Sequence, residues 1–223
     1  MNTNRGTFDR QLGTLRDQVA QMGDMVQQSI SLSVCALQNQ DMALAKQIDQ
    51  SDSQVNARRF AVEERAYQLL AMQQPCARDM RTIVGLVTTI TNLERIGDHA
   101  AGIARLTLRL GEHPVIMPLP LFGAMAITDQ WLLRNSVTAF VTQDEELAQT
   151  VIDRDSEVDQ MHRDAYQQLL TTMAQNPDSI EAGTMMLWVS HNLERIGDRA
   201  SNIAVRVSYL TKGELIRHPD PQP

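Results

Sequence analysis

Apolar residues recur every three or four positions along most of the chain, which is the spacing that places them on one face of an α-helix. In residues 7–39 this face is formed by Leu12, Leu15, Val19, Met22, Val26, Ile30, Val34 and Leu37. The same spacing continues through five further stretches, which are residues 41–75, 76–110, 121–142, 144–175 and 178–211. The pattern therefore predicts an all-α fold of six long amphipathic helices.

Turn-forming residues separate these stretches. Asp41 is a candidate N-cap of the second helix, because its carboxylate can accept a hydrogen bond from the first turn, and Gly111 ends the third. The strongest break contains three prolines: Pro114, Pro118 and Pro120. Three helices precede this break and three follow it. We therefore expect two similar three-helix bundles, residues 1–113 and 121–223, joined by a proline-rich linker over residues 114–120.

One tract occurs twice, one hundred residues apart. The nine residues after position 91 read Asn-Leu-Glu-Arg-Ile-Gly-Asp-His-Ala, and eight of these residue types return one hundred positions later. Each copy places two carboxylates four apart on one helical face, Glu94 with Asp98 and Glu194 with Asp198. Like charges at this spacing oppose each other by roughly 0.2–0.5 kcal/mol. We interpret the repeat as a duplicated domain with a duplicated acidic cluster, whose repulsion a bound cation would relieve.

Polar residues also interrupt the apolar seams of two other predicted helices. Asp52 and Arg59 occupy heptad positions of the second helix where an apolar residue is expected. Asp155 and His162 occupy the corresponding positions of the fifth helix. We interpret Arg59 as an ion-pair partner rather than as a catalytic group.

Small residues accompany each acidic pair on the third and sixth helices. They are Gly97 and Ala101 in the first copy, and Gly197 and Ser201 in the second. Such residues let another helix or a ligand approach the backbone closely. Beside them runs an apolar stripe, which in the sixth helix begins at Trp188-Val189. We expect the acidic pairs at the flank of the core, beside a shallow groove.

Neighbouring helices within each bundle should bring these carboxylates together as two metal sites. The expected ligands are Asp52, Asn56, Glu94 and Asp98 in the first bundle, and Asp155, Asp159, Glu194 and Asp198 in the second. Oxygen-rich sites suit Mg²⁺, Mn²⁺, Ca²⁺ or iron better than metals that prefer soft ligands. The candidate cofactors are divalent or trivalent ions (Mg, Mn, Fe or Zn), and the sequence does not identify the metal. Asn56 replaces a carboxylate, so the first site should be the weaker one.

A simpler interpretation treats each acidic pair as an exposed helix face. In both copies an arginine lies three residues before the aspartate, and the two side chains could form a solvated salt bridge. The duplication, the facing pairs and the adjacent small residues together favour the metal interpretation. His99 and His162 lie near the clusters and are weak candidate ligands.

Composition excludes several classes of function. The chain has 20 Lys and Arg against 27 Asp and Glu, a formal net charge of −7, and no basic stripe, which argues against binding to nucleic acid. No window reaches the roughly 20 apolar residues of a membrane span, and the amino terminus does not resemble a secretory signal. Cys35 and Cys76 lack CxxC spacing, which favours a reduced cytoplasm, and we expect both to be small buried hydrophobic residues.

Further tracts accompany the repeated motif: Phe8-Asp9, Asp52-x-x-Val55-Asn56, the stretch from Gln74 to Arg81, and Tyr209 to Glu214. Together with the two Leu-Glu-Arg-Ile-Gly-Asp copies, they resemble the PhoU family of phosphate-uptake regulators over nearly the whole chain. The resemblance implies two three-helix bundles with metal ions on the acidic pairs. Asn56 departs from the family's pattern, which puts full occupancy of the first site in doubt.

The resemblance also implies a function. Members of this family are not enzymes but cytoplasmic negative regulators, and they commonly form dimers. They link a high-affinity ABC phosphate importer, at its cytoplasmic ATPase, to a membrane sensor histidine kinase, and they suppress the starvation response when phosphate is plentiful. We therefore expect a homodimer with no nucleic-acid partner and no membrane insertion. The chain has no GxxxxGK[ST] loop and no concentrated basic cluster, so sensing through protein partners is more economical than direct phosphate binding.

Two alternatives stay open. One is a helical-bundle carboxylate metalloprotein, either a metal store or a metal-dependent hydrolase. Redox proteins of that type use Glu together with ExxH from paired helices, and the ExxxD pairs here lack a properly spaced histidine, so redox chemistry is disfavoured while hydrolysis is not. The other alternative is a plain dimerising bundle without metal.

Overall fold

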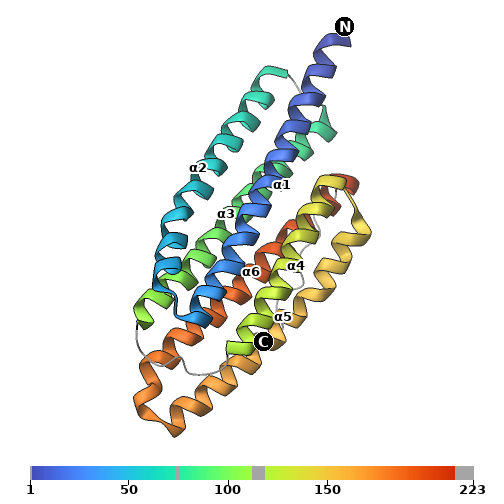
Figure 1. The fold of residues 1–223 in the computed structure, drawn as a ribbon. Coiled ribbons are helices and arrows are strands. Elements are labelled where there is room, and N and C mark those ends of the chain that lie inside the picture. The colour runs from blue at the N-terminus through green and yellow to red at the C-terminus, as the bar shows by residue number, and fades with distance from the viewer. Residues whose placement is uncertain (1, 74–75, 112–118, 214–223) are drawn as a thin grey trace.

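The computed structural model describes residues 2–73, 76–111 and 119–213. Its long elements are six helices: α1 (Asn2–Asn39), α2 (Met42–Gln73), α3 (Ala77–Leu110), α4 (Leu119–Thr142), α5 (Glu145–Gln175) and α6 (Ile180–Lys212) (Figure 1). A short 3-10 turn, η1 (Pro177–Ser179), precedes α6. The described residues contain no strand, and the predicted all-α fold is confirmed.

The predicted helix ends agree with the structure to within two residues except at the start of α1, and the earlier start of α4 also has a physical reason. α1 begins at Asn2 rather than at residue 7, and the Arg5 guanidinium in this extra turn donates to the carboxylate of Asp79 on α3 at 2.6 Å. α4 begins at Leu119, so Pro120 lies in its first turn, where a helix does not need the missing N–H. The rest of the predicted linker, and Pro75 at the predicted end of the second helix, lie outside the described residues. The proposed domain boundaries therefore stay a prediction.

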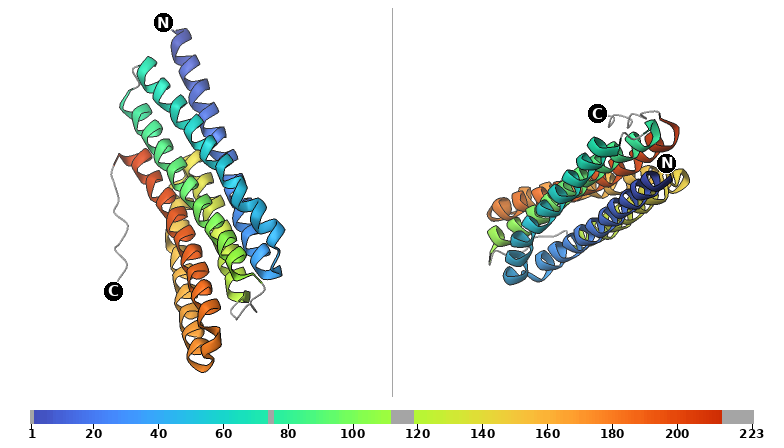
Figure 2. Two further views of the ribbon diagram at one scale, coloured as in Figure 1. Left: turned by 90° about the vertical axis from the view of Figure 1, so that its left-hand side faces the viewer. Right: turned by 90° about the horizontal axis from the view of Figure 1, so that it is seen from above.

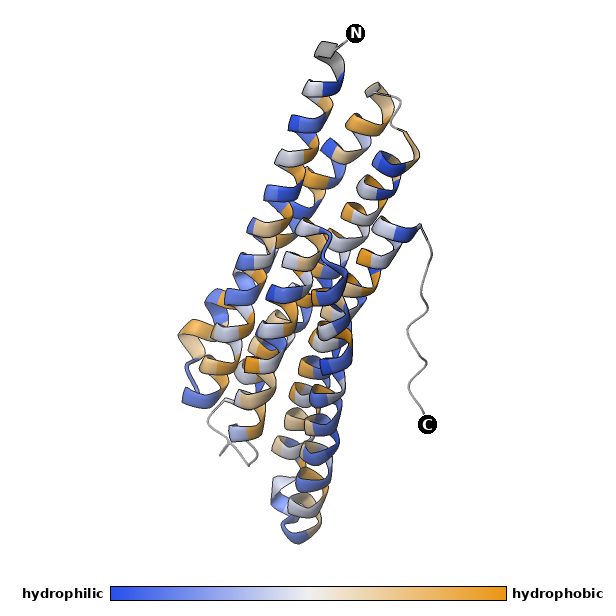
Figure 3. Cartoon of the chain, turned by 90° about the vertical axis from the view of Figure 1, so that its right-hand side faces the viewer, coloured by the Kyte–Doolittle hydropathy of each residue, from blue (hydrophilic) through white to orange (hydrophobic). Residues whose placement is uncertain are grey.

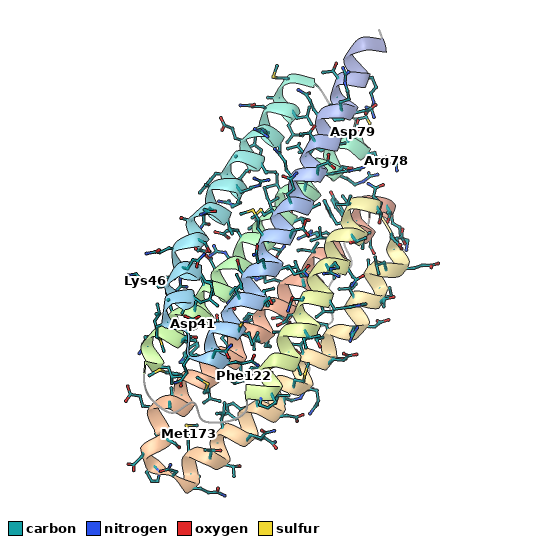
Figure 4. The ribbon with its side chains drawn as sticks, in the orientation of Figure 1. Asp41, Lys46, Arg78, Asp79, Phe122 and Met173 are labelled. Atoms are coloured by element: carbon teal, nitrogen blue, oxygen red, sulfur yellow. The ribbon has the colours of Figure 1, made fainter. Side chains whose placement is uncertain are left out.

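The two halves of the chain use the same turn between their first and second helices. Gln40 and Gln143 both have positive φ, at 49° and 58°. The aspartate that follows each of them caps the next helix: Asp41 accepts from the Leu44 N–H at 2.9 Å, and Asp144 accepts from the Leu147 N–H at 3.0 Å. Figure 4 shows Asp41 at the α1–α2 turn. The predicted cap at Asp41 is confirmed, and the repeated turn gives a register for comparing the halves.

The six helices form two three-helix bundles side by side in an elongated molecule (Figures 1 and 2). Within the halves, α1, α2 and α3 pack together, as do α4, α5 and α6. Between the halves, α3 packs against α6 and α1 against α4. Gly85 lies against Leu210 and Gly102 against Asn192, so α3 and α6 run antiparallel. One continuous apolar core spans both halves, and hydrophobic residues line the inner sides of the helices (Figure 3).

Three residues that the sequence predicted to be buried are exposed, so these predictions are wrong. Cys35 and Cys76 are both exposed. Cys35 follows the buried Val34 and falls outside the apolar face of α1, whereas Cys76 precedes α3, where its Sγ donates to the carboxylate of Asp79 at 2.9 Å. Trp188 is 56% exposed, and its neighbour Val189 carries the apolar stripe of α6 instead.

None of the described helices is both long enough and apolar enough to cross a membrane.

Candidate metal centre

The structure brings together the four residues predicted for the first site. The Asn56 side chain on α2 donates to the carboxylate of Asp52 one turn earlier, at 3.2 Å. Burial, and next the charge of Asp98 on α3, raise the pKa of Asp52 above its ordinary value. The pKa of Glu94 is raised by the same two causes. The four side chains are close together, but the Asn56 amide already satisfies part of the hydrogen-bonding capacity of Asp52.

Arginines offset the negative charge of this first cluster. Arg105 lies 2.8 Å from Asp49, and its charge lowers the pKa of Asp52. Arg59 forms an ion pair with Glu63 at 3.1 Å, as the sequence predicted for this seam position, and its charge lowers the pKa of Glu94. In the first half, arginine side chains therefore supply positive charge beside the carboxylates.

The second site is more acidic and more compact. Asp159 on α5 and Glu194 and Asp198 on α6 can each present one oxygen so that all three atoms lie within 4.8 Å of one another. We call these three residues the surface triad. Burial first, and then the charge of Asp198, raise the pKa of Glu194 to about 7. A cation bound among three carboxylate oxygens would offset this shift by stabilising the ionised form, and hard cations are bound by oxygen sets of this kind.

Asp155 lies deeper than the surface triad. It is only 6% exposed, one turn before Asp159 on α5. Its Oδ1 lies 3.4 Å from the point where a β-carbon on Gly197 would stand. In the first half, Gly97 is approached in the same way by Val55, at 3.3 Å, and by Asp52, at 3.6 Å. The predicted small residues thus allow close approach, and the neighbouring helix occupies the space.

Sequence analysis missed Asp129 on α4, which belongs to the same region. Asp129 is fully buried, and among the described residues neither of its carboxylate oxygens has a hydrogen-bond partner. Burial, and next the charges of Asp155 and Glu194, raise its pKa well above the ordinary value. Asp129 lies in phase with the buried Met125 and Leu133 of α4, so it is a polar residue on an apolar seam. That is the signal that identified Asp52 and Asp155, and it could have identified Asp129.

Two histidines lie at the edge of the second cluster. His191, which the sequence analysis did not single out, places its Nδ1 3.6 Å from Glu194. His162 on α5 places its Nδ1 2.8 Å from the Ser190 hydroxyl. Burial is the first cause that lowers the pKa of each imidazole. Both rings therefore favour the neutral form, which is the form that can bind a metal.

His99, the other histidine that the sequence suggested, has a different place. Its Nδ1 lies 3.0 Å from the side-chain oxygen of Asn192 on α6, so it links the two halves of the chain. Burial lowers its pKa. It belongs to the contact between α3 and α6 rather than to either acidic cluster.

The salt bridges of the simpler interpretation are also present. Arg95 lies 3.1 Å from Asp98, and Arg195 lies 2.8 Å from Asp198. Each arginine is about half exposed, and exposed pairs of this kind contribute only about 0–1 kcal/mol. In the second half, the Arg195 guanidinium lies 3.7 Å from Glu194 and 2.8 Å from Asp198, which are two of the three carboxylates of the surface triad. The ion pair alone therefore leaves the second cluster with excess negative charge, and the donor set fits a hard cation.

Comparison with known proteins matches both halves of the chain. The family model described as the PhoU domain matches residues 19–107 and again residues 125–207. The phosphate-specific transport system accessory protein PhoU of Escherichia coli K12 is 34% identical over 216 residues, which cover 96% of this chain and 88% of that protein. A homologue of that accessory protein from Aquifex aeolicus is 31% identical, over 94% of this chain and 95% of that protein.

Solved structures agree with the sequence comparison. The crystal structure of PhoU from Pseudomonas aeruginosa superposes with a TM-score of 0.89 at 32% identity, covering 93% of this chain and 100% of that chain. The phosphate transport system regulatory protein PhoU from Streptococcus pneumoniae gives a TM-score of 0.88 at 29% identity, with coverages of 94% and 99%. The similarity therefore extends over both bundles.

Proposed function

The chain belongs to the PhoU family, and we propose that it is a cytoplasmic negative regulator of the phosphate-starvation response. In this role it links a high-affinity ABC phosphate importer, at its cytoplasmic ATPase, to a membrane sensor histidine kinase, and it limits phosphate uptake. It acts as a homodimer. The observation that carries the proposal is similarity over nearly the whole length to proteins named as accessory and regulatory components of phosphate transport.

The family is one of accessory and regulatory proteins rather than enzymes, in agreement with the non-enzymatic prediction. The architecture supports an adaptor role, because six long helices on one continuous core form a rigid body with extended faces. Rigid faces bind partners without an ordering cost. The metal-store and hydrolase alternatives lack a comparable observation in their favour.

We further propose that the surface triad of Asp159, Glu194 and Asp198 binds a divalent or trivalent metal ion, with Asp155 behind it. The support is the close approach of three carboxylates and the raised pKa of Glu194. The first cluster, with Asn56 and its neighbouring arginines, binds metal more weakly. Metal at the second cluster would set the charge of the face that the partners contact.

The regulatory proposal is tested by deleting the gene from its own organism, in a strain with no second copy. A reporter for a starvation gene should then stay on in phosphate-rich medium, because importer and kinase no longer share a partner. Complementation with Glu194→Lys should restore repression less well than complementation with Asp17→Lys, a charge reversal at an exposed position of α1. Normal repression in the deletion strain would refute the regulatory role.

A further inference from the structure

The first half of the chain contains a cavity between α1 and α2, two helices that pack against each other (Figure 1). Its volume is about 300 Å³, and small-molecule sites usually measure roughly 300–1,000 Å³. The cavity lies on the α1 side of α2, whereas Asp52 of the first acidic cluster approaches Gly97 of α3. The residues that line the cavity belong to neither acidic cluster, so it is a separate feature of the molecule.

The second half fills the corresponding space with its own side chains. In the register set by the equivalent turns, Gln28 of the cavity corresponds to Trp131, and Ser51 corresponds to Arg154. The guanidinium carbon of Arg154 lies over the Trp131 ring, 4.4 Å from its centroid. Arg154 also forms an ion pair with Glu157 at 3.0 Å. The same place in the fold therefore holds an aromatic ring in the second half and is open in the first.

The open cavity combines an apolar floor with uncharged polar groups. Its floor includes Ile48 and Val55, both of which are buried. Three exposed glutamines also line it: Gln28, Gln47 and Gln54. Their side-chain amides form no hydrogen bond with other described residues, so they are available to a ligand. No charged residue of the described chain lines the cavity.

This lining fits a neutral, planar ring that carries both hydrogen-bond donors and acceptors. The apolar floor can cover the face of such a ring. Each glutamine amide offers a carbonyl acceptor and an amine donor, and glutamine can pair with two neighbouring edge atoms of adenine at once. An indole ring has a single N–H donor and would leave most of these groups unused. An anionic group would find no positive charge in the lining.

We propose that the cavity between α1 and α2 binds a purine nucleobase. The apolar floor contacts the face of the base, and the glutamine amides bind its edge. The base takes the place that the Trp131 ring fills in the second half. This site goes beyond the proposed regulatory function and depends neither on that function nor on bound metal. Because the lining is uncharged, recognition is confined to the base, and a nucleoside and its nucleotide should bind alike.

The test uses adenosine as the probe, with untagged full-length protein and isothermal titration calorimetry. The parent should bind adenosine at a single site per chain. The double variant Gln28→Trp with Ser51→Arg copies the second half and should abolish binding, because its own ring fills the cavity. Gln54→Leu removes one amide and should weaken binding about tenfold. Gln50→Trp, at an exposed position of α2 outside the cavity, is the control and should bind adenosine as the parent does.

Circular dichroism establishes whether each variant is folded. If the double variant does not fold, Gln54→Leu supplies the decisive result, since it changes an exposed side chain and leaves the floor intact. Adenosine binding by Gln54→Leu at the parent's affinity would then overturn the proposal. So would binding by a folded double variant that equals binding by the parent, or a parent that does not bind adenosine at millimolar concentration.

AMP and indole separate recognition of the base from other sources of affinity. AMP should bind as tightly as adenosine, and indole should bind more weakly than either. AMP binding far more tightly than adenosine would mean that phosphate is recognised rather than the base. Indole binding as tightly as adenosine would mean that the amides contribute nothing. Either result overturns the proposal, and neither bears on the regulatory role, which the gene deletion tests separately.

Discussion

Glu194 should make the stability of the metal-free protein fall as pH rises through neutrality. Its pKa is raised from the ordinary 4.5 to about 7, first by burial and then by the charge of Asp198. The unfolded chain releases this proton near the ordinary value, whereas the folded protein retains it until about pH 7. Stability from this group is therefore fully present below pH 4.5 and is lost between pH 4.5 and about 7.

The expected magnitude follows from the shift and from the exposure of the side chain. One pKa unit corresponds to about 1.4 kcal/mol, so the undiscounted difference is about 3 kcal/mol. The Glu194 side chain is 21% exposed, and an exposed arginine lies beside it, so water screens part of this effect. We expect a loss of about 1–2 kcal/mol after this discount. In a chain of this size that corresponds to roughly 2–8 °C in unfolding temperature.

The assay is thermal unfolding in chelator from pH 5 to pH 8, for the parent and for Glu194→Gln. The glutamine cannot ionise, so the variant should lose most of the decline that the parent shows. A saturating divalent metal should cancel the decline in the parent, because metal binding requires the deprotonated carboxylates and strengthens as pH rises. Identical pH profiles for parent and variant in chelator would refute the assigned pKa and the electrostatic account of the cluster.

Three further outcomes are expected. Glu194→Ala should remove more bound divalent metal than Glu94→Ala, measured by elemental analysis of untagged protein; equal losses would contradict the ranking of the two sites. Asp155→Asn should leave the helical circular dichroism intact, since packing supplies most helix stability, and a collapse of that signal would mean that metal holds the bundle together. Asp79→Ala should lower the free energy of urea unfolding by about 1–3 kcal/mol, because it leaves Arg5 without its buried partner and removes a charge-assisted bond. An unchanged midpoint would show that this contact contributes nothing.

The helical architecture could be predicted from the sequence because its cause is periodic. Apolar residues at three- and four-residue spacing specify which face of each helix is buried, and residues such as Val19, Val26 and Ile30 are fully buried as expected. The start of α1 could not be predicted in the same way, since its first turn is joined to the rest of the molecule through Arg5 and Asp79. Contacts between residues so distant in the sequence leave no local pattern.

The candidate site was predictable to the extent that it repeats. The duplicated tract and the facing pairs on α2 and α5 identified both clusters, and the structure places those residues together. Asp129 belongs to no duplicated motif, so its place on the apolar seam between Met125 and Leu133 was the one sequence signal that marked it. The offsetting roles of Arg59 and Arg105 likewise depend on distances that the sequence does not contain.

The two acidic clusters contain the same repeated motif but differ in what balances their negative charge. This difference bears on regulation. In the first half, Asn56 and the arginines of α2 and α3 lie beside the carboxylates permanently. In the second half, the positions that match Asn56 and Arg59, counted from the equivalent turn residues Gln40 and Gln143, carry Asp159 and His162, and Asp129 adds one more acid. The charge of an arginine does not change near neutral pH, whereas bound cations and carboxylate protons can be gained and lost. The second half is therefore the part whose surface charge would respond to metal supply and pH, and a regulator that signals through charged faces would do so there.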